Sequence, residues 1–251
     1  LHDALPILQD AHRVGVQAGL AVGIYRDLAV GVNRGSCDVW SGVMHTEAFN
    51  VDGYGVNVWT SGQVLYALEA SLGAPPDPLG PLGQTWGLSP QNPRVLKEAA
   101  YEPLIALYRA NMRDCGALRI DHAAGLNRLW WVREGKSADH GAYVDSCMHD
   151  LLGIIALESV RNRCLIIAED LGTIPQELRT ALKELGAFSY KLFFGERAAD
   201  GGYIAPRDYP AQAMAALTTH DMPTLYGWWN GLDLELGGRL GLYTPAQAVR
   251  L

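Results

Sequence analysis

The sequence contains few cysteines and lacks the basic runs and long apolar segments that are typical of several protein classes. Only four of its 251 residues are cysteine and none forms a CxxC pair, so we expect free thiols in a reducing cytoplasm, with neither a disulfide framework nor a zinc site. The formal net charge is −7 and Lys and Arg form no run, which argues against a nucleic-acid partner. No apolar stretch reaches membrane-spanning length, so a membrane partner is not expected either.

The two ends of the sequence indicate a piece of a longer chain. It does not begin with Met, and its first residues have neither the charged start nor the apolar stretch of a signal peptide. Residues 244–251 keep helical spacing up to the last position. Hydrophobic residues make up 49% of the composition, which is enough for a sizeable core. We therefore expect residues 1–251 to form one partial domain.

Apolar runs that alternate with helical periodicity predict an α/β fold with a parallel sheet. Helices are expected near residues 8–18, 93–115, 143–163 and 175–185, and strands near 21–32, 118–120, 165–168, 189–194 and 214–218. This alternation favours a (β/α)8 barrel, but these five strands fall short of the eight that a closed TIM barrel needs. The predicted fold is therefore a truncated barrel.

Two segments interrupt the alternation. Residues 73–87, GAPPDPLGPLGQTWG, contain too many prolines for a helix or an inner strand, so a long ordered loop is expected there. The string CDVWSG at 37–42 is nearly repeated as VNVWTSG at 56–62. We interpret the segment at about 43–59 as a local insertion in a surface loop.

Three short acidic motifs stand at the ends of apolar runs. GALRIDH contains Asp121, LIIAEDLG contains Glu169 and ALTTHDMPT contains Asp221. Because the carboxyl ends of parallel barrel strands meet on one face, we expect these three carboxylates to converge. Two carboxyl groups flanking a bond are what glycosidic cleavage requires. The motifs therefore predict a sugar-cleaving site.

The neighbours of the two central carboxylates suit them to opposite tasks. Arg119 shares a strand face with Asp121 and would keep that carboxylate ionised, as a nucleophile must be. Glu169 follows a run of apolar residues, which would raise its pKa and suit a general acid. His220 and Asp221 could grip sugar hydroxyls. Taken singly, each motif could also be a helix cap or loop residue, and the His220–Asp221 pair a metal pair without a third ligand.

At this point the motifs resemble those of the 4-α-glucanotransferases, also called amylomaltases or disproportionating enzymes, a family of the α-amylase clan of retaining barrel enzymes. ALRIDH, IIAEDLG, TTHDMPT, YRDLAVGV and GAPPDPLGPLGQTWGLSP all take part, and the resemblance extends from about residue 19 to 243. It implies that Asp121 is the nucleophile, Glu169 the general acid/base and Asp221 the transition-state stabiliser. It implies no metal and no organic cofactor.

The resemblance also implies a set of substrate-binding residues, namely Arg119, His122, His220, Asp77, Trp86 and Asp27. Trp86 offers a flat face for stacking on a glucose ring, and loop packing is the equal alternative. Asp27 is expected to support the foot of the groove. The matching strands correspond to the third to seventh of the barrel, and the segment at 43–59 has no counterpart.

The implied activity is transfer of a segment of a 1,4-α-D-glucan to the 4-hydroxyl of an acceptor glucan or glucose, by a retaining double displacement. Maltooligosaccharides and other 1,4-α-glucans would be the partners. Two alternatives stay open: an α-glucan hydrolase of the same clan, and an inactive fragment that binds glucans.

Overall fold

The structure is a computed structural model, and it describes residues 4–36, 39, 65–67, 69–77, 80–242 and 244. The chain divides into two compact units, Leu1–Phe188 and Ser189–Leu251. The segment at 43–59, for which the sequence predicts an insertion, lies outside the described residues. Within the described part of the chain, the model contains no helix with the length and apolar character needed to span a bilayer.

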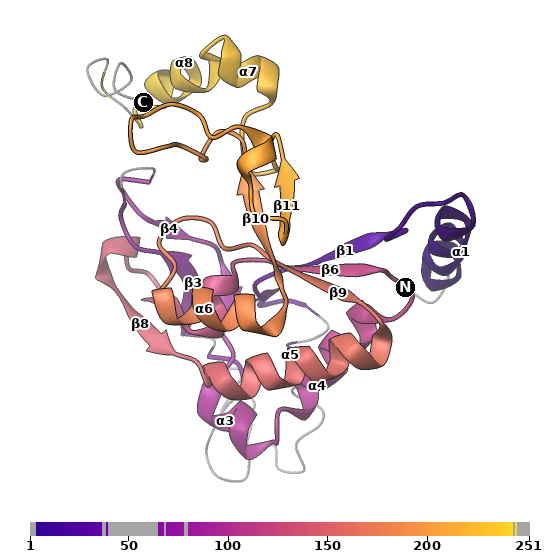
Figure 1. The fold of residues 1–251 in the computed structure, drawn as a ribbon. Coiled ribbons are helices and arrows are strands. Elements are labelled where there is room, and N and C mark those ends of the chain that lie inside the picture. Colours follow the sequence, from indigo (N-terminus) through magenta and orange to yellow (C-terminus); the bar gives the residue numbers. More distant parts are fainter. Residues whose placement is uncertain are drawn as a thin grey trace. The chain divides into compact units, whose positions relative to one another are not determined.

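A parallel sheet forms the centre of the first unit (Figure 1). Its strands are β1 (Tyr25–Leu28), β6 (Ala117–Ile120) and β9 (Leu165–Ala168), with β6 in the middle. All four residues of β6 are buried, which explains why its sequence is apolar apart from Arg119. The strands predicted at 118–120 and 165–168 are confirmed, whereas β1 begins four residues later than the strand expected from residue 21.

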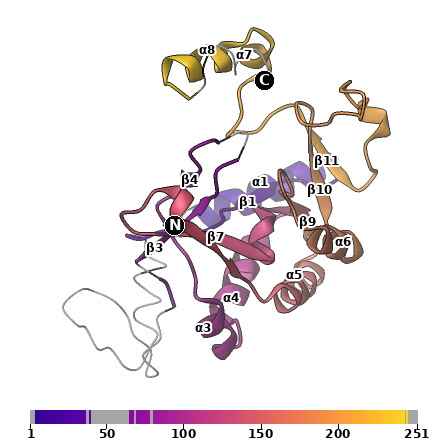
Figure 2. The ribbon, with the colours of Figure 1, turned by 90° about the vertical axis from the view of Figure 1, so that its left-hand side faces the viewer.

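Helices cover this sheet and close the core against it. They are α3 (Pro93–Glu98), α4 (Glu102–Met112), α5 (Met148–Asn162) and α6 (Gln176–Leu185), whereas the described side chains of α1 (Ala4–Gln17) are mostly exposed. Helices α4, α5 and α6 follow one another along the same side of the molecule (Figure 2). The core between them and the sheet includes Met112, Leu118, Ile155 and Leu178, each at most 1% exposed. Burial of these side chains is the main source of this unit's stability.

The region with helical spacing at 93–115 forms two helices, because the backbone breaks between α3 and α4. Ala100 and Tyr101 both have positive φ, at 50° and 60°, which no helix tolerates. Pro103 then lies in the first turn of α4, where its missing N–H costs no hydrogen bond, as its position in the sequence predicts.

An antiparallel sheet in the first unit was not predicted. Its order is β4 (Gln84–Thr85), β3 (Ala70–Ala74), β7 (Arg128–Arg133) and β8 (Gly141–Asp145), and a two-stranded sheet pairs β2 (Val32–Asn33) with β5 (Leu88–Ser89). The helix expected from residue 143 is therefore wrong over its first turn, which belongs to β8. The expected loop at 73–87 includes the β3–β4 pairing, where a Cβ on Gly73 would stand 2.0 Å from the carbonyl oxygen of Gln84.

Among its described residues, which extend to 242 and include 244, the second unit contains two parallel strands and two α-helices. These are β10 (Phe188–Leu192), whose first residue closes the first unit, β11 (Ala213–Ala216), α7 (Leu225–Trp229) and α8 (Leu232–Arg239). Both strands were predicted within two residues. Short 3-10 turns lie at Ala123–Leu126, Ala138–His140 and Pro206–Asp208. The chain is thus an α/β protein with parallel strands in both units, as expected for part of a barrel.

Candidate active site

Asp121 and Glu169 follow directly after the neighbouring parallel strands β6 and β9. Ile120 pairs with Ala168 in register, so the two acidic residues occupy the next pair of adjacent positions. The hydrogen-bond ladder continues past the strand ends, because the Glu169 amide donates to Ile120 at 3.0 Å and the Ala123 amide donates to the Glu169 carbonyl at 3.0 Å. The Asp121 amide donates to Leu28 of β1 at 3.0 Å. The backbone therefore brings these two sequence-predicted residues together.

Arg119 lies between two carboxylates. Its Nη1 atom is 2.8 Å from Asp121 Oδ1 and 2.6 Å from Asp27 Oδ1, and its side chain is only 5% exposed. A buried guanidinium needs such partners, since an uncompensated charge is costly away from water. Burial opposes its charge, but the hydrogen bond with Asp27 and the charge of Asp121 outweigh burial and raise the pKa of Arg119. The predicted pairing of Arg119 with Asp121 is confirmed.

The environment of Glu169 differs from that of Asp121. Burial raises the pKa of Glu169 to about 7; Arg119 opposes this shift and the charge of Asp121 adds to it. The direction predicted from the apolar residues before Glu169 is confirmed. A carboxyl with this pKa is protonated in a large fraction of molecules near neutral pH, which is what a general acid requires.

His122 and Trp86 contact each other beside these carboxyls. Their rings meet edge to face, with centroids 5.2 Å apart and planes 77° apart. Trp86 Nε1 donates to Gln84 Oε1 at 2.8 Å, which fixes the indole on β4. Burial lowers the pKa of His122, and the charge of Asp121 offsets part of this shift, so the imidazole is neutral near pH 7. The stacking of Trp86 on a sugar stays a prediction.

Gln84 is the one residue of this group that sequence reasoning missed. It lies two positions before Trp86, so the two side chains leave the same side of an extended segment. That spacing was the available signal.

Asp77 makes its described hydrogen bonds within its own turn. Its Oδ1 accepts from the Gly80 amide at 2.5 Å, and its amide donates to the Gly80 carbonyl at 3.1 Å.

His220 and Asp221 follow β11 in the second unit. His220 Nε2 lies 3.2 Å from Asp221 Oδ2, and the two side chains are 69% and 68% exposed. The Asp221 amide donates to Thr219 Oγ1 at 3.2 Å. Because these residues belong to the other unit, the convergence of all three carboxylates stays a prediction. Among the described residues, no group of three or more His, Cys, Asp and Glu side chains could hold a metal ion.

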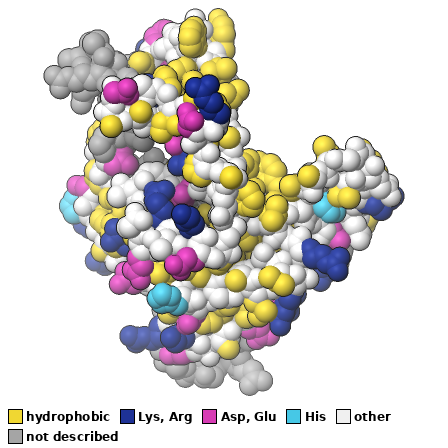
Figure 3. Space-filling model, in the orientation of Figure 1, with side chains coloured by type: hydrophobic (Ala, Val, Ile, Leu, Met, Phe, Trp, Pro, Cys, Tyr) yellow, Lys and Arg dark blue, Asp and Glu magenta, His cyan; other side chains and the backbone are white. Residues whose placement is uncertain are grey.

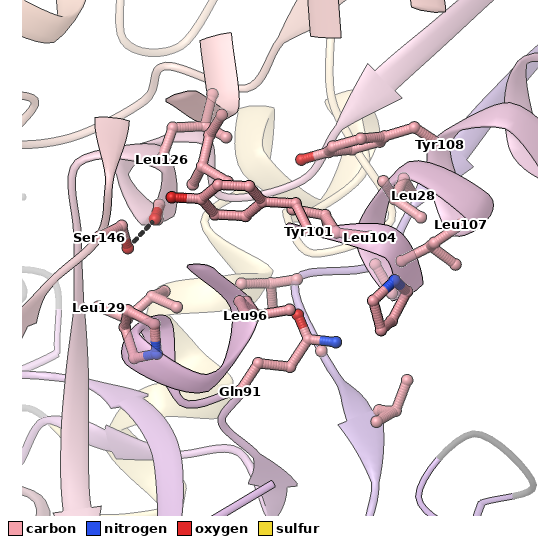
Figure 4. Close-up of a pocket in the computed structure, with 18 of the residues that line it drawn as sticks. Leu28, Gln91, Leu96, Tyr101, Leu104, Leu107, Tyr108, Leu126, Leu129 and Ser146 are labelled. Carbon is pink, nitrogen blue, oxygen red and sulfur yellow. Dashed lines mark hydrogen bonds between the residues drawn. The ribbon is translucent and has the colours of Figure 1, made fainter. Parts of the chain in front are cut away.

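A cavity of about 580 Å³ in the first unit includes Asp121 and His122 in its lining, and Figure 4 labels other residues that line it. Most of its lining is apolar and includes Leu28, Leu104 and Tyr108. Ser146, labelled in the same view, donates its hydroxyl to the carbonyl of Gly125 at 2.8 Å. A glucan needs many hydrogen-bonding partners, so this mostly apolar cavity is better suited to an apolar ligand. Asp121 belongs both to the lining of the cavity and to the acidic site described above.

Comparisons with known proteins agree with this arrangement. The family profile described as 4-alpha-glucanotransferase matches residues 7–242. A 4-alpha-glucanotransferase of Haemophilus influenzae is 48% identical over 227 residues, which cover 90% of this chain and 29% of that protein. A 4-alpha-glucanotransferase of Mycobacterium tuberculosis is 34% identical over 247 residues, which cover 96% of this chain and 31% of that protein.

Two solved structures also resemble this chain. The amylomaltase of Corynebacterium glutamicum has a TM-score of 0.82 and 32% identity, over 97% of this chain and 32% of that one. The amylomaltase of Streptococcus agalactiae, solved with acarbose, has a TM-score of 0.65 and 25% identity, over 90% of this chain and 45% of that one. The chain spans about three tenths of the length of the curated relatives named above.

Proposed function

This chain belongs to the 4-alpha-glucanotransferase family, and on that premise we propose that it contributes to a site that transfers a segment of a 1,4-α-D-glucan to the 4-hydroxyl of an acceptor glucan or glucose. The main support is the difference between the two adjacent carboxyls: Asp121 is paired with Arg119 at 2.8 Å, and Glu169 has a pKa of about 7. Maltooligosaccharides are the proposed substrates. The relative solved with acarbose supports a site for sugar-like ligands.

In the first step, Asp121 attacks the anomeric carbon while Glu169 gives its proton to the departing glycosidic oxygen. A covalent glycosyl–enzyme intermediate with inverted configuration results. Arg119 contacts Asp121 and fixes its direction, and Asp27 contacts Arg119 from the other side. The carboxyl separation expected for such a retaining pair is about 5–5.5 Å.

In the second step, Glu169 acts as a base. It takes the proton of the acceptor's 4-hydroxyl as that oxygen attacks the intermediate, and the second inversion restores the original configuration. Its pKa of about 7 allows both roles, because the proton is neither held too tightly nor lost too easily near neutral pH. The neutral His122 and the pair His220–Asp221 are the proposed partners of the donor sugar's hydroxyls.

Whether a sugar hydroxyl or a water molecule attacks the glycosyl–enzyme intermediate depends on how well the site excludes water. Trp86 contacts His122, and Glu169 and His122 are partly shielded from solvent, which supports a site that limits access of water. We propose that the segment at 73–87, which contains Asp77 and Trp86, favours an acceptor glucan over water. A hydrolase would be expected to leave this side open.

Incubation with maltotriose tests the proposal. A ladder of longer oligosaccharides is expected, whereas only glucose and maltose would indicate an α-glucan hydrolase. The matched control is Asp121→Asn, which keeps the side-chain shape and removes the nucleophilic charge. No turnover together with saturable glucan binding by calorimetry would instead support an inactive glucan-binding fragment, and unchanged turnover in Asp121→Asn would overturn the nucleophile assignment.

A further inference from the structure

Two cysteines lie in contact at the amino ends of β6 and β9, away from the acidic strand ends. Cys115 Sγ and Cys164 Sγ are 3.7 Å apart, and the residues are 3% and 2% exposed. Each precedes one of two strands that lie side by side (Figure 1). The Leu165 amide donates to the Gly116 carbonyl at 2.9 Å and holds the two backbones together between the thiols.

A positive charge lies beside this pair. Arg26 of β1 donates from Nη1 to the Ala110 carbonyl at 3.3 Å, while its buried Nε has no hydrogen-bond partner among the residues that the structure describes. The hydrogen bond that Cys164 gives to Cys115 lowers the pKa of the Cys115 thiol; burial opposes this, the charge of Arg26 assists it, and Asp114 opposes it. Cys115 is thus the thiol that ionises first, and Cys164 stays protonated beside it.

We propose that Cys115 and Cys164 are an oxidation site that a small hydroperoxide converts into a disulfide between β6 and β9. In the first step the Cys115 thiolate attacks one peroxide oxygen, so that an S–O bond forms, the O–O bond breaks, and the leaving hydroxide takes up a proton to become water (or an alcohol). Cys164 then attacks the Cys115 sulfenic acid as its own proton departs, and the second oxygen leaves as water. Two thiols lose two hydrogens in total and the peroxide gains them.

The geometry allows this bond to form with little backbone movement. A disulfide needs its sulfurs about 2.05 Å apart and its Cα atoms about 4.4–6.8 Å apart. The register of β6 and β9 places Cys164 opposite Gly116, one position from Cys115. A spacing of about 4.8 Å between strands and about 3.3 Å along a strand puts the two Cα atoms about 6 Å apart, which falls within that range. Side-chain rotation would bring the sulfurs from 3.7 Å to bonding distance. This site is separate from the carboxyls of the proposed function and does not depend on that function.

Mass spectrometry of the purified chain tests the proposal. After treatment with hydrogen peroxide and blocking of the remaining thiols, the intact protein should carry two fewer blocking groups than the reduced and blocked protein, because two of its four thiols form the disulfide. Trypsin cuts after Arg113, Arg119, Arg163 and Arg179, so a cross-link would join peptide 114–119 to peptide 164–179. Cys147 falls in another peptide and serves as the internal control.

Matched variants separate this pair from other thiol chemistry. Cys147→Ser should keep the cross-link, whereas Cys115→Ser and Cys164→Ser should abolish it, and Cys164→Ser should leave a Cys115 sulfenic acid that dimedone traps. The disulfide would close a loop between positions 49 residues apart and should therefore raise the melting temperature by several degrees. Reduction with dithiothreitol should reverse this increase. A link that involves Cys147, or one that forms only in urea, would overturn the proposal.

The role of Arg26 has its own test. Arg26→Met removes the charge and should slow cross-linking several-fold, and Arg26→Lys should restore much of the rate because it keeps the charge. Circular dichroism melts of both variants show whether the sheet is intact. Equal rates in the three folded proteins would show that Arg26 has no part in the reaction.

Discussion

The two units present the same sequence signal in different surroundings. In the first unit, Asp121 and Glu169 follow strands within a buried sheet, and a guanidinium that is 5% exposed fixes Asp121. In the second unit, Asp221 also follows an apolar strand, yet its side chain is 68% exposed and its described ion pair is with the adjacent His220. An acidic residue after a strand is therefore a weak indication by itself, because the residues around the strand end decide how exposed its side chain is and which partner it has.

The units also differ in how they bury hydrophobic side chains. Leu118 and Leu178 of the first unit are fully buried, whereas Leu217 and Trp229 of the second are 55% and 77% exposed. Hydrophobic side chains are visible on the surface over α7 and α8 (Figure 3). Aromatic contacts partly replace a core there, since Phe194 stacks on Trp228 with centroids 4.7 Å apart. The first unit is consequently expected to be the more resistant to unfolding.

The largest expected effect contrasts the two aspartates. Asp121→Asn should lower turnover of maltotriose on the order of 10⁴-fold, since no covalent intermediate can form. Asp221→Asn should cost about 10²–10³-fold, because it removes one stabilising group and leaves the nucleophile in place. Initial rates of oligosaccharide formation measure both. Equal losses of turnover would show that the different surroundings of Asp121 and Asp221 do not affect how much each contributes to catalysis.

The next effect contrasts the two cores. Leu118→Ala should reduce the free energy of unfolding by about 3 kcal/mol, because it leaves a cavity in a site that cannot collapse. Leu217→Ala should change it by less than about 0.5 kcal/mol, as expected for an exposed side chain. Urea titration followed by circular dichroism compares them. A large effect at Leu217 would mean that its exposed position is wrong.

A third prediction uses the titration of Glu169. Its folded pKa of about 7 lies above the ordinary value of 4.5, so the folded state holds a proton that the unfolded chain has released between these values. The stability contribution is fully present below about pH 4.5 and is lost as the pH rises to about 7. Relative to wild type, Glu169→Gln should therefore be more stabilising at about pH 8 than at about pH 4.5, by about 3 kcal/mol.

The same variant should lose turnover, and the wild-type rate should fall as the pH rises through about 7, because the proton donor disappears. Urea titrations of both proteins at the two pH values check the stability effect. An identical pH dependence in wild type and Glu169→Gln would show that another group titrates there.

The smallest expected effect concerns the outer partner of Arg119. Asp27→Asn keeps a hydrogen-bond acceptor but removes one charge, and should cost about 1 kcal/mol of stability and lower the rate several-fold. Asp10→Asn is the matched control, since its ion pair with Arg13 lies on the surface and is expected to contribute almost nothing. If the two variants behave alike, Asp27 does not support the site.

Local signals explain what could be predicted from the sequence. The apolar runs before Asp121 and Glu169 predicted β6 and β9 within a residue, and the same apolar character predicted the raised pKa of Glu169. Pro103 indicated where the main helix of the 93–115 region starts, but the positive φ angles of Ala100 and Tyr101 could not be predicted, because neither residue type favours them and only the surrounding packing could impose them. Strand β8 was missed because its pairing with β7 is a tertiary contact that overrides a weak local preference.

The site residues likewise divide into those whose contacts the local sequence predicts and those whose contacts depend on the folded structure. Arg119 and Asp121 are two residues apart, and their pairing could be predicted from strand geometry alone. Asp27 contacts Arg119 across 92 positions, and only the family resemblance indicated a supporting role for it. Gln84 was missed because its hydrogen bond to Trp86 depends on side-chain direction within a loop that composition alone describes poorly.

The hydrogen bond from the Ala123 amide to the Glu169 carbonyl has a mechanical consequence. The segment that follows one carboxyl is fastened to the backbone of the other, so a thermal fluctuation that displaces either must drag its neighbour along. We expect loops around the site to be able to rearrange without changing the separation of the two carboxyls. That separation depends on a main-chain hydrogen bond, so proline at position 123, which has no amide N–H, is the substitution that would remove this link directly.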